Sequence, residues 1–347
     1  MFTARAFIPS LARSGAAACL AALLWALTPP AWAEEDLPPP PFAPQPQAPA
    51  QPAAELTLIL DSPDGMGLPR SFRTANDSIS PDLADPPSLA GLKGLGISGS
   101  AQFSRAQLLE MRYHLPRFFT VVDLRQESHG LISGLAVSWY GPRDQANAGG
   151  SLDYVERDED SRLRAALAAG RVALAEIISK DAQGGIARSE STTWEVTSAQ
   201  TEAQLLALQG LGYFRLPITD HLRPGDQAVE DFLIFWRGLP SGSWLHFHCH
   251  AGKGRTTTFM LMTDILANAH QVELADLARR QHLLGGSDLL GSPPADWRRE
   301  AYLERTAFLR SFYDFARQTP LGQPGSWLAW AESHRPDPAR ESHPGGP

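Results

Sequence analysis

The segment WLHFHCHAGKGRTT, residues 244–257, constrains the fold more than any other part of the chain. Trp244–His248 is rich in hydrophobic and aromatic side chains, which is typical of a strand. Gly254–His270 is a long apolar stretch that predicts a helix. A strand that leads through a short loop into a helix is the building unit of α/β proteins. Since strands and helices alternate along the chain, we predict an α/β fold whose mostly parallel central sheet is flanked by helices.

Hydrophobic patterns and turn residues place the other elements. The further predicted strands are Leu56–Leu60, Phe118–Leu124, Leu135–Tyr140, Val172–Ser179, Thr192–Thr197 and Tyr213–Pro217. The further predicted helices are Gln107–Arg117, Thr201–Leu208, Ala228–Leu239, Leu274–Leu284 and Trp297–Arg317. The strands around 135–197 predict a small β-rich subdomain inside a domain that spans residues 55–335.

The N-terminus has the order of a secretory signal peptide. Arg5 and Arg13 make the start positive, residues 16–27 are apolar, and Ala31–Ala33 forms a small-x-small cleavage pattern. The alternative is a membrane anchor, but the apolar run is short of the ~20 residues that span a bilayer. We therefore expect residues 1–33 to be removed and the protein to be exported, as a periplasmic or secreted protein without a membrane segment.

The two ends of the mature chain have little hydrophobic periodicity. Residues 34–54 are rich in Pro, Ala and Gln, which predicts a flexible leader. Residues 336–347 predict a flexible tail. The 347 residues of the chain are enough for one large domain or two modest ones.

Composition limits the possible partners. The formal net charge of −8 argues against general binding of nucleic acids, whose phosphates attract basic surfaces. A polyanion must therefore meet a local basic pocket. Of the two cysteines, Cys19 lies in the predicted signal, so the mature chain keeps only Cys249. A free thiol in an oxidising compartment indicates that its chemistry is needed.

The loop after the strand has a Cys-x5-Arg pattern that suits phosphate chemistry. We expect Gly252 and Gly254 to adopt positive φ, so that backbone N–H groups converge on one point at a helix N-terminus. Cys249 at the base of this nest is then a candidate nucleophile in its thiolate form. Arg255 can hold two phosphoryl oxygens, and the Thr256 hydroxyl can ease departure of the thiolate.

Two other interpretations of this loop are weaker. A nucleotide-binding P-loop needs Ser or Thr after the lysine, but Gly254 follows Lys253. A metal site would need His246, His248 and Cys249 together, whereas alternate residues of a strand point to opposite faces. We expect no metal and no other cofactor, because Arg255 and the backbone amides supply the positive field.

A cysteine nucleophile of this kind needs a general acid for the leaving alcohol. Asp220 follows a predicted strand, at the end where the loops of a parallel sheet gather. Asp226 is the competing acid. A helix cap or a turn would also account for an aspartate at position 220.

Three segments resemble the protein-tyrosine-phosphatase-like phytases. They are HCHAGKGRT (248–256), YFRLPITDHLRP (213–224) and VVDLRQESHGLISGLAVSWY (121–140), and the similarity runs from about Phe72 to His334. The resemblance implies the cysteine-phosphatase fold, with Asp220 as general acid and His221 as a substrate contact. The loop residues that it assigns to phosphate binding are His250, Ala251, Gly252, Lys253 and Gly254.

The resemblance also implies contacts to outer phosphates. Arg73 in SFRTAND matches a phosphate-binding arginine, and Arg298 and Arg305 match two basic contacts of a C-terminal helix. An ordinary solvated helix is the alternative for that pair. Asp144 matches a polar pocket residue, and Lys180 a further basic contact.

Some positions depart from the family pattern. The family usually has lysine at positions 298 and 305, so the outer contacts differ in geometry. It often has glutamate where His250 stands. With Lys253, the loop is more cationic and resembles that of tensin-type inositol-lipid phosphatases.

The expected substrate is a heavily phosphorylated small molecule, inositol hexakisphosphate, which the resemblance implies is dephosphorylated stepwise through a phosphocysteine. A phosphatase for phosphotyrosine or inositol lipids is the alternative. A catalytically dead polyphosphate-binding module is disfavoured, because nucleophile, arginine and candidate acid are all present. The sequence makes no prediction of an oligomeric state.

Overall fold

The computed structural model describes residues 56–65, 67–320 and 325–334. The predicted signal peptide, the leader of residues 34–54 and the tail of residues 336–347 lie outside this part of the chain. Within it, no helix combines the length and the apolar character that crossing a membrane requires.

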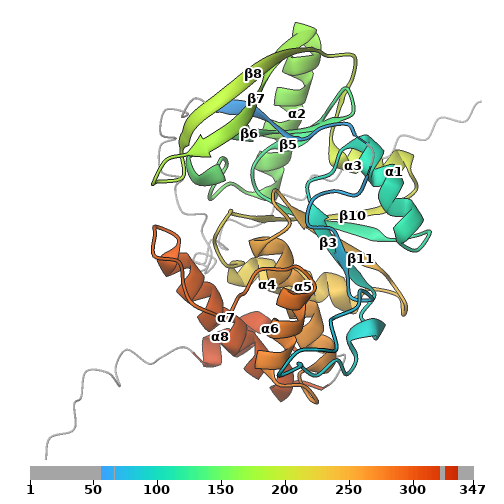
Figure 1. Cartoon of the computed structure of the whole chain (residues 1–347), viewed down its shortest axis with the longest axis vertical. Helices are drawn as coiled ribbons and strands as arrows, with labels where there is room; N and C mark the ends of the chain where they lie inside the picture. Colours follow the sequence, from blue (N-terminus) through green and yellow to red (C-terminus); the bar gives the residue numbers. More distant parts are fainter. Residues whose placement is uncertain (1–55, 66, 321–324, 335–347) are drawn as a thin grey trace, which may run out of the picture. The chain divides into compact units, whose positions relative to one another are not determined.

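A five-stranded sheet forms the centre of the fold, in the order β10-β4-β11-β3-β2 (Figure 1). Its strands are β2 (Arg73–Thr74), β3 (Ile97–Ala101), β4 (Thr120–Arg125), β10 (Gly212–Ile218) and β11 (Leu245–Cys249). Only the short β2 runs antiparallel to its neighbour. The predicted α/β fold with a mostly parallel central sheet is confirmed.

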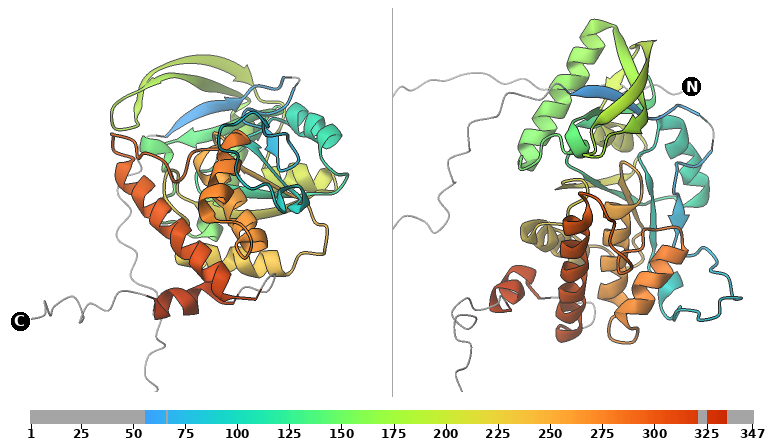
Figure 2. Two further views of the ribbon diagram at one scale, coloured as in Figure 1. Left: turned by 60° about the horizontal axis from the view of Figure 1, so that its bottom comes forward. Right: turned by 60° about the vertical axis from the view of Figure 1, so that its left-hand side comes forward.

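Helices cover both faces of this sheet (Figures 1 and 2). One face carries α4 (Asp226–Arg237), α5 (Gly254–Asn268), α6 (Leu274–Leu283), α7 (Arg299–Gln318) and α8 (Trp327–Ser333). The other carries α1 (Arg105–His114) and α3 (Glu202–Leu208). Val121 and Val122 of β4 point to opposite faces and join two different hydrophobic clusters.

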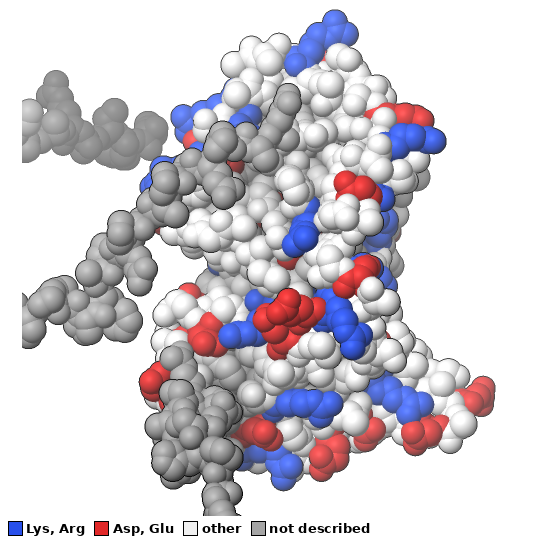
Figure 3. Space-filling model, turned by 90° about the vertical axis from the view of Figure 1, so that its left-hand side faces the viewer, with Lys and Arg blue, Asp and Glu red and all other residues white. Residues whose placement is uncertain are grey.

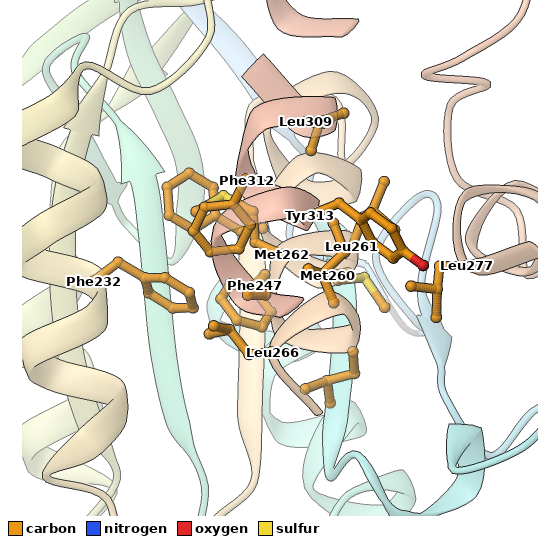
Figure 4. Packing of buried hydrophobic residues seen from close by; sticks show 14 of the residues in the cluster. Phe232, Phe247, Met260, Leu261, Met262, Leu266, Leu277, Leu309, Phe312 and Tyr313 are labelled. Atoms are coloured by element: carbon orange, nitrogen blue, oxygen red, sulfur yellow. The ribbon is translucent and has the colours of Figure 1, made fainter. Parts of the chain in front are cut away.

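The larger cluster packs α5 between the sheet and the outer helices (Figure 4). Phe247 of β11 lies beside Phe232 of α4 and Phe259 of α5, with ring centroids 6.2 and 6.3 Å away. Met260, Leu261 and their neighbours are fully buried, and α5 is buried nearly all round. This burial fixes the position of the helix whose N-terminus carries the Cys249 loop.

A six-stranded sheet, in the order β8-β7-β1-β6-β5-β9, forms the β-rich part of the fold. Its strands are β1 (Thr57–Ser62), β5 (His129–Ile132), β6 (Leu135–Tyr140), β7 (Arg171–Lys180), β8 (Ile186–Glu195) and β9 (Ala199–Gln200). The helix α2 (Leu152–Ala169) packs on it. The predicted β-rich subdomain is present, and it also takes in β1, β5 and β9, which lie outside the 135–197 stretch.

The sequence analysis missed β3, a central strand of sequence ISGSA. Serine and glycine favour strands weakly, so its composition gave little signal. The packing explains the glycine: a Cβ on Gly99 would lie 2.6 Å from Sδ of Met260 on α5. Ser98 and Ser100 each hydrogen-bond the His246 ring of the adjacent β11, at 2.9 and 3.0 Å.

Candidate active site

The candidate nucleophile and general acid meet at the carboxyl end of the central sheet, where sites of parallel sheets are found. Cys249 ends β11, and Asp220 follows the end of β10. A cavity of about 390 Å³ opens over them. It is lined by Asp220, His221, Cys249, Ala251, Lys253, Gly254, Ser287, Asp288, Leu289, Pro294, Arg298, Tyr302 and Arg305.

The loop from Cys249 to α5 depends on one glycine in particular. Gly252 has φ 70°, and a Cβ there would lie 2.3 Å from the Ala101 backbone nitrogen. The expectation for Gly254 was wrong, because Gly254 does not have positive φ and begins α5. The Thr256 hydroxyl donates to Sγ of Cys249 at 3.2 Å. The loop therefore holds the sulfur at the floor of the cavity, beside the helix N-terminus.

Arg255 is buried and held rigidly. Its two terminal nitrogens bind the Glu127 carboxylate at 2.8 and 2.9 Å, and Nη1 also donates to the Ile218 carbonyl at 3.0 Å. Its Nε is buried and has no hydrogen-bond partner among the described residues. A buried donor without a partner is costly unless a ligand accepts from it. Nε is thus available to an oxyanion, which fits the predicted phosphate contact.

Glu127 is the functional residue that the sequence analysis overlooked. Burial raises its pKa, but the charges of Arg255 and Arg125 outweigh this and lower it, so the carboxylate stays ionised. Its place in DLRQESHG could have indicated a functional role, but that segment served only to support the family resemblance. Tyr302, Ser287 and Asp288 also line the cavity without having been predicted.

Asp220 contacts the arginine that it is expected to work beside. Its Oδ1 lies 3.1 Å from Nη2 of Arg255, and its Oδ2 lies 3.2 Å from the His221 ring. Burial raises the pKa of Asp220, but the charges of Arg255 and His221 hold it below its ordinary value. The competing Asp226 lies outside the cavity, bonded to Arg223 at 3.1 Å.

The loop that carries Asp220 is pinned from two sides. Gln145 donates to the Asp220 carbonyl at 3.0 Å, and Arg305 donates to the carbonyls of His221 and Leu222. His221 has φ 66°, and its ring packs edge-on against Trp297, with centroids 4.8 Å apart. A left-handed non-glycine residue costs free energy, so its presence beside the acid fits a functional constraint.

Three of the predicted outer cations line the cavity. Lys253 donates to the Gly285 carbonyl at 2.7 Å. Arg298 is about half exposed and pairs with Asp296, and Arg305 is buried. Basic and acidic side chains are interspersed on the face drawn in Figure 3. The cavity must therefore attract an anion through these few residues rather than through a broadly basic surface.

Arg73 is not among the residues that line the cavity, and its expected contact with a substrate phosphate stays a prediction. The side chain is buried, and it donates to the Gly252 carbonyl at 2.8 Å and to the Thr257 hydroxyl at 3.0 Å. Burial lowers its pKa to about 10, although Cys249 opposes the shift. Arg73 thus supports the phosphate-binding loop from behind.

Replacing Arg73 with methionine tests this supporting role. Loss of two buried hydrogen bonds lets the loop shift, so we expect kcat to fall by about tenfold or more. The fall should be the same for inositol hexakisphosphate and for p-nitrophenyl phosphate in steady-state assays. A higher KM for the hexakisphosphate alone would instead restore Arg73 as a substrate contact.

Three further predicted site residues are not among those that line the cavity. The His250 side chain binds Asp144 at 2.6 Å. Asp144 is buried. Lys180 ends β7 and lies over the Tyr140 ring, 4.6 Å from its centroid, and its expected substrate contact stays a prediction.

One buried group in the described residues has the spacing of metal ligands, namely Asp123, Glu202 and His248. Their ligand atoms already have protein partners: Nε2 of His248 binds Glu202 at 2.8 Å, and Asp123 accepts from Tyr213 at 2.8 Å. Arg215 also lies 3.2 Å from Asp123. A cation there would face this guanidinium, so the group is better described as a hydrogen-bonded network under the sheet.

Comparison with known proteins places this site in a family. The sequence model of the PTP-like phytase family matches residues 122–267, and the description of that family reads "Inositol hexakisphosphate". A PTP-like phytase from Bdellovibrio bacteriovorus is 33% identical, with a TM-score of 0.64 over 82% of this chain and 97% of that one. The PTP-like myo-inositol phosphatase from Mitsuokella multacida, solved with myo-inositol-(1,3,4,5)-tetrakisphosphate, is 32% identical, with a TM-score of 0.74 over 83% of this chain and 50% of that one.

The effector protein hopD2 of Pseudomonas syringae pv. tomato is 32% identical over 286 residues, which are 80% of this chain and 60% of hopD2. The chain thus spans between half and two thirds of the length of hopD2 and half of the Mitsuokella chain. It matches the Bdellovibrio phytase over nearly its whole length. On this fold, loop geometry and identity, the chain belongs to the family of protein-tyrosine-phosphatase-like phytases.

Proposed function

We propose that the protein is a phosphatase that removes phosphates stepwise from inositol polyphosphates, with inositol hexakisphosphate as its substrate. One observation carries the proposal. Cys249 and Asp220 line one cavity, Asp220 lies 3.1 Å from Nη2 of the neighbouring Arg255, and the buried Nε of Arg255 has no hydrogen-bond partner in the part of the chain that the structure describes. Nucleophile, oxyanion donor and proton donor are the three groups that transfer through a phosphocysteine needs.

In the proposed first step, Sγ of Cys249 attacks the phosphorus in line with the scissile bond. The S–P bond forms as the P–O bond to the inositol breaks, and Asp220 gives its proton to the leaving oxygen. In the second step, a water oxygen attacks the phosphorus and gives a proton to the Asp220 carboxylate, and the S–P bond breaks as the new P–O bond forms, which releases inorganic phosphate and returns the Cys249 thiolate. The Thr256 hydroxyl, 3.2 Å from the sulfur, stabilises the departing thiolate.

The choice of an inositol polyphosphate rests on the cavity and on the relatives. Lys253, Arg298 and Arg305 lie around the cavity, where phosphates other than the scissile one can reach them. The Mitsuokella relative was solved with an inositol tetrakisphosphate. The alternative, a phosphatase for phosphotyrosine or inositol lipids, would use the same Cys249 loop.

Phosphate release separates these candidates. Inositol hexakisphosphate, a phosphotyrosine peptide and vesicles containing an inositol lipid phosphate should be compared at equal concentration, with and without a chelator. The proposal expects the hexakisphosphate to be hydrolysed with the highest kcat/KM and the chelator to have no effect. A higher kcat/KM for either other substrate would replace the proposal with that activity.

We also propose that the mature enzyme is exported after cleavage behind Ala33. The support is the sequence pattern of the first residues. Expression of the full chain, followed by mass spectrometry of the periplasmic and extracellular fractions, should find a protein that begins at Glu34. An uncleaved protein confined to the cytoplasm would contradict the proposal.

Replacing Arg298 with alanine tests recognition of the outer phosphates. Its guanidinium is about half exposed at the cavity. Ordinary salt therefore weakens its attraction to a phosphate, since the screening length is about 8–10 Å. We expect KM for inositol hexakisphosphate to rise several-fold, most at low ionic strength, while p-nitrophenyl phosphate kinetics stay as in the wild type. Arg299→Ala is the matched control, since Arg299 is exposed on the same helix but does not line the cavity.

An equal effect of both substitutions would assign Arg298 to the solvated face of α7.

Arg305 should behave differently from Arg298. It holds the carbonyls of the loop that carries Asp220, so Arg305→Ala should lower kcat for both substrates.

A further inference from the structure

The His250 side chain connects the nucleophile loop to the β-rich part of the fold. The residue follows Cys249 directly, but its ring lies between two carboxylates that come from other elements. Nδ1 is 2.6 Å from Asp144, in the 3-10 turn Pro142–Asp144, and Nε2 is 3.4 Å from Asp61 of β1. The ring is 17% exposed and both carboxylates are buried.

Asp61 has a second connection, which leads to the other side of the site. Its Oδ2 lies 2.6 Å from Nη1 of Arg125, and Nε of Arg125 lies 2.7 Å from Glu127. Glu127 in turn holds both terminal nitrogens of Arg255. One buried carboxylate therefore connects to the residue beside the nucleophile and, through two further residues, to the arginine expected to hold the phosphate.

The charges around the ring decide its state. Asp61, Asp144, Arg125 and Asp220 are the charged groups that act on His250. Burial lowers the pKa of His250, but the two nearer carboxylates outweigh it and raise the pKa above its ordinary 6.5. The favourable contribution of the imidazolium is therefore complete below pH 6.5 and is lost as the pH rises through the raised value.

We propose that His250, as an imidazolium held by Asp61 and Asp144, is a positioning residue that fixes Cys249 relative to Arg255. The proposal rests on the proposed phosphatase activity. In this proposal the positive charge of His250 pairs with two buried carboxylates of the protein, and it does not pair with a phosphate of the substrate. A loop displaced by about 1 Å can lose on the order of 100-fold in rate, so the effect belongs to kcat rather than to KM.

The test uses p-nitrophenyl phosphate, whose hydrolysis needs neither an outer phosphate nor a strong general acid. His250→Gln keeps a hydrogen-bonding side chain of similar length but carries no charge. We expect it to lower kcat by about 10- to 100-fold at pH 5.5, with KM changed less than threefold. Asp144→Asn should show the same pattern with a smaller loss, and it decides the question if His250→Gln fails to fold.

The pH profile separates positioning from mere stability. In an Asp220→Asn background, which lacks the expected general acid, kcat should still fall as the pH rises above 6.5, and adding His250→Gln should remove that fall. Asp264→Asn is the control for a lost buried ion pair, since Asp264 binds Arg280 away from the cavity. It should lower the melting temperature without changing the pH profile.

Two results would overturn the proposal. One is a kcat for His250→Gln within threefold of the wild type, and the other is a pH profile that His250→Gln leaves unchanged. Nuclear magnetic resonance titration of the His250 ring needs no turnover, and Asp61→Asn should lower its pKa. If that shift occurs while the wild type hydrolyses no phosphate ester, the proposed function fails and the His250–Asp61 contact stands.

Discussion

Replacing Cys249 with serine is expected to abolish turnover while the protein still binds inositol hexakisphosphate. The sulfur lies at the cavity floor and accepts a hydrogen bond from Thr256, whereas we expect the loop amides and Arg255 to hold the phosphate. A serine hydroxyl is a poor nucleophile without a base beside it. We expect kcat to fall on the order of 10⁴-fold or more, with the dissociation constant for the hexakisphosphate changed only a few-fold.

Binding can be followed by isothermal titration calorimetry on the Cys249→Ser protein, because turnover no longer consumes the ligand. Retained binding also serves as the control for folding. A variant that keeps kcat within tenfold of the wild type would remove Cys249 as the nucleophile. A variant that loses both turnover and binding would show that the sulfur supports the loop itself.

The sequence predicted the parts of the site that depend on local geometry. The strand, the loop and the helix from 244 to 270 form one continuous unit, so the contact of Thr256 with Cys249 follows from their spacing. Asp220 could be placed near them because the carboxyl ends of parallel strands share one edge of a sheet. The structure brings it to within 3.1 Å of Arg255.

The contacts that could not be predicted concern side chains whose partners are far away in the sequence. His250 was expected to bind phosphate together with its neighbours in the loop, but its ring binds Asp144, which is 106 positions away. Arg73 likewise contacts Gly252, at a separation of 179 positions. Sequence spacing predicts which side chains of one helix or strand point the same way. It does not predict which other helix, strand or loop supplies their hydrogen-bond partners in the folded protein.

Buried supporting residues were missed for the same reason. The contacts of Glu127 to Arg255 span 128 positions, so its segment DLRQESHG marks the family but does not show which side chain Glu127 holds. β3 was missed because its serine and glycine residues have a low strand propensity. They are small because α5 packs closely against this strand. These positions are set by tertiary packing, which overrides the local pattern.

Replacing Asp220 with asparagine is expected to lower kcat for inositol hexakisphosphate by roughly 10²- to 10⁴-fold, the usual loss when a general acid is removed. An inositol oxygen is a poor leaving group unless it receives a proton. The loss should shrink for p-nitrophenyl phosphate, because its leaving group departs as a stable anion. Asp226 lies outside the cavity and is bonded to Arg223, so Asp226→Asn is the matched control and should leave kcat for both substrates unchanged.

The pH dependence gives a sharper test of the same residue. A general acid must carry its proton, so turnover falls as the pH rises through its pKa. In the free protein the charges of Arg255 and His221 hold the pKa of Asp220 below its ordinary value, against the effect of burial. A bound phosphate dianion places negative charge beside Arg255 and so raises the pKa of the neighbouring carboxyl.

The falling limb of kcat, which reports the complex, should therefore lie at higher pH than that of kcat/KM, which reports the free enzyme. Sulfate keeps its charge across this range and allows a direct measurement. Its binding to Cys249→Ser protein, followed by calorimetry at pH 5 in buffers of different ionisation enthalpy, should take up protons. That uptake should fall when Asp220→Asn is added, and an uptake that Asp220→Asn leaves unchanged would assign the titrating group, and with it the acid, to another residue.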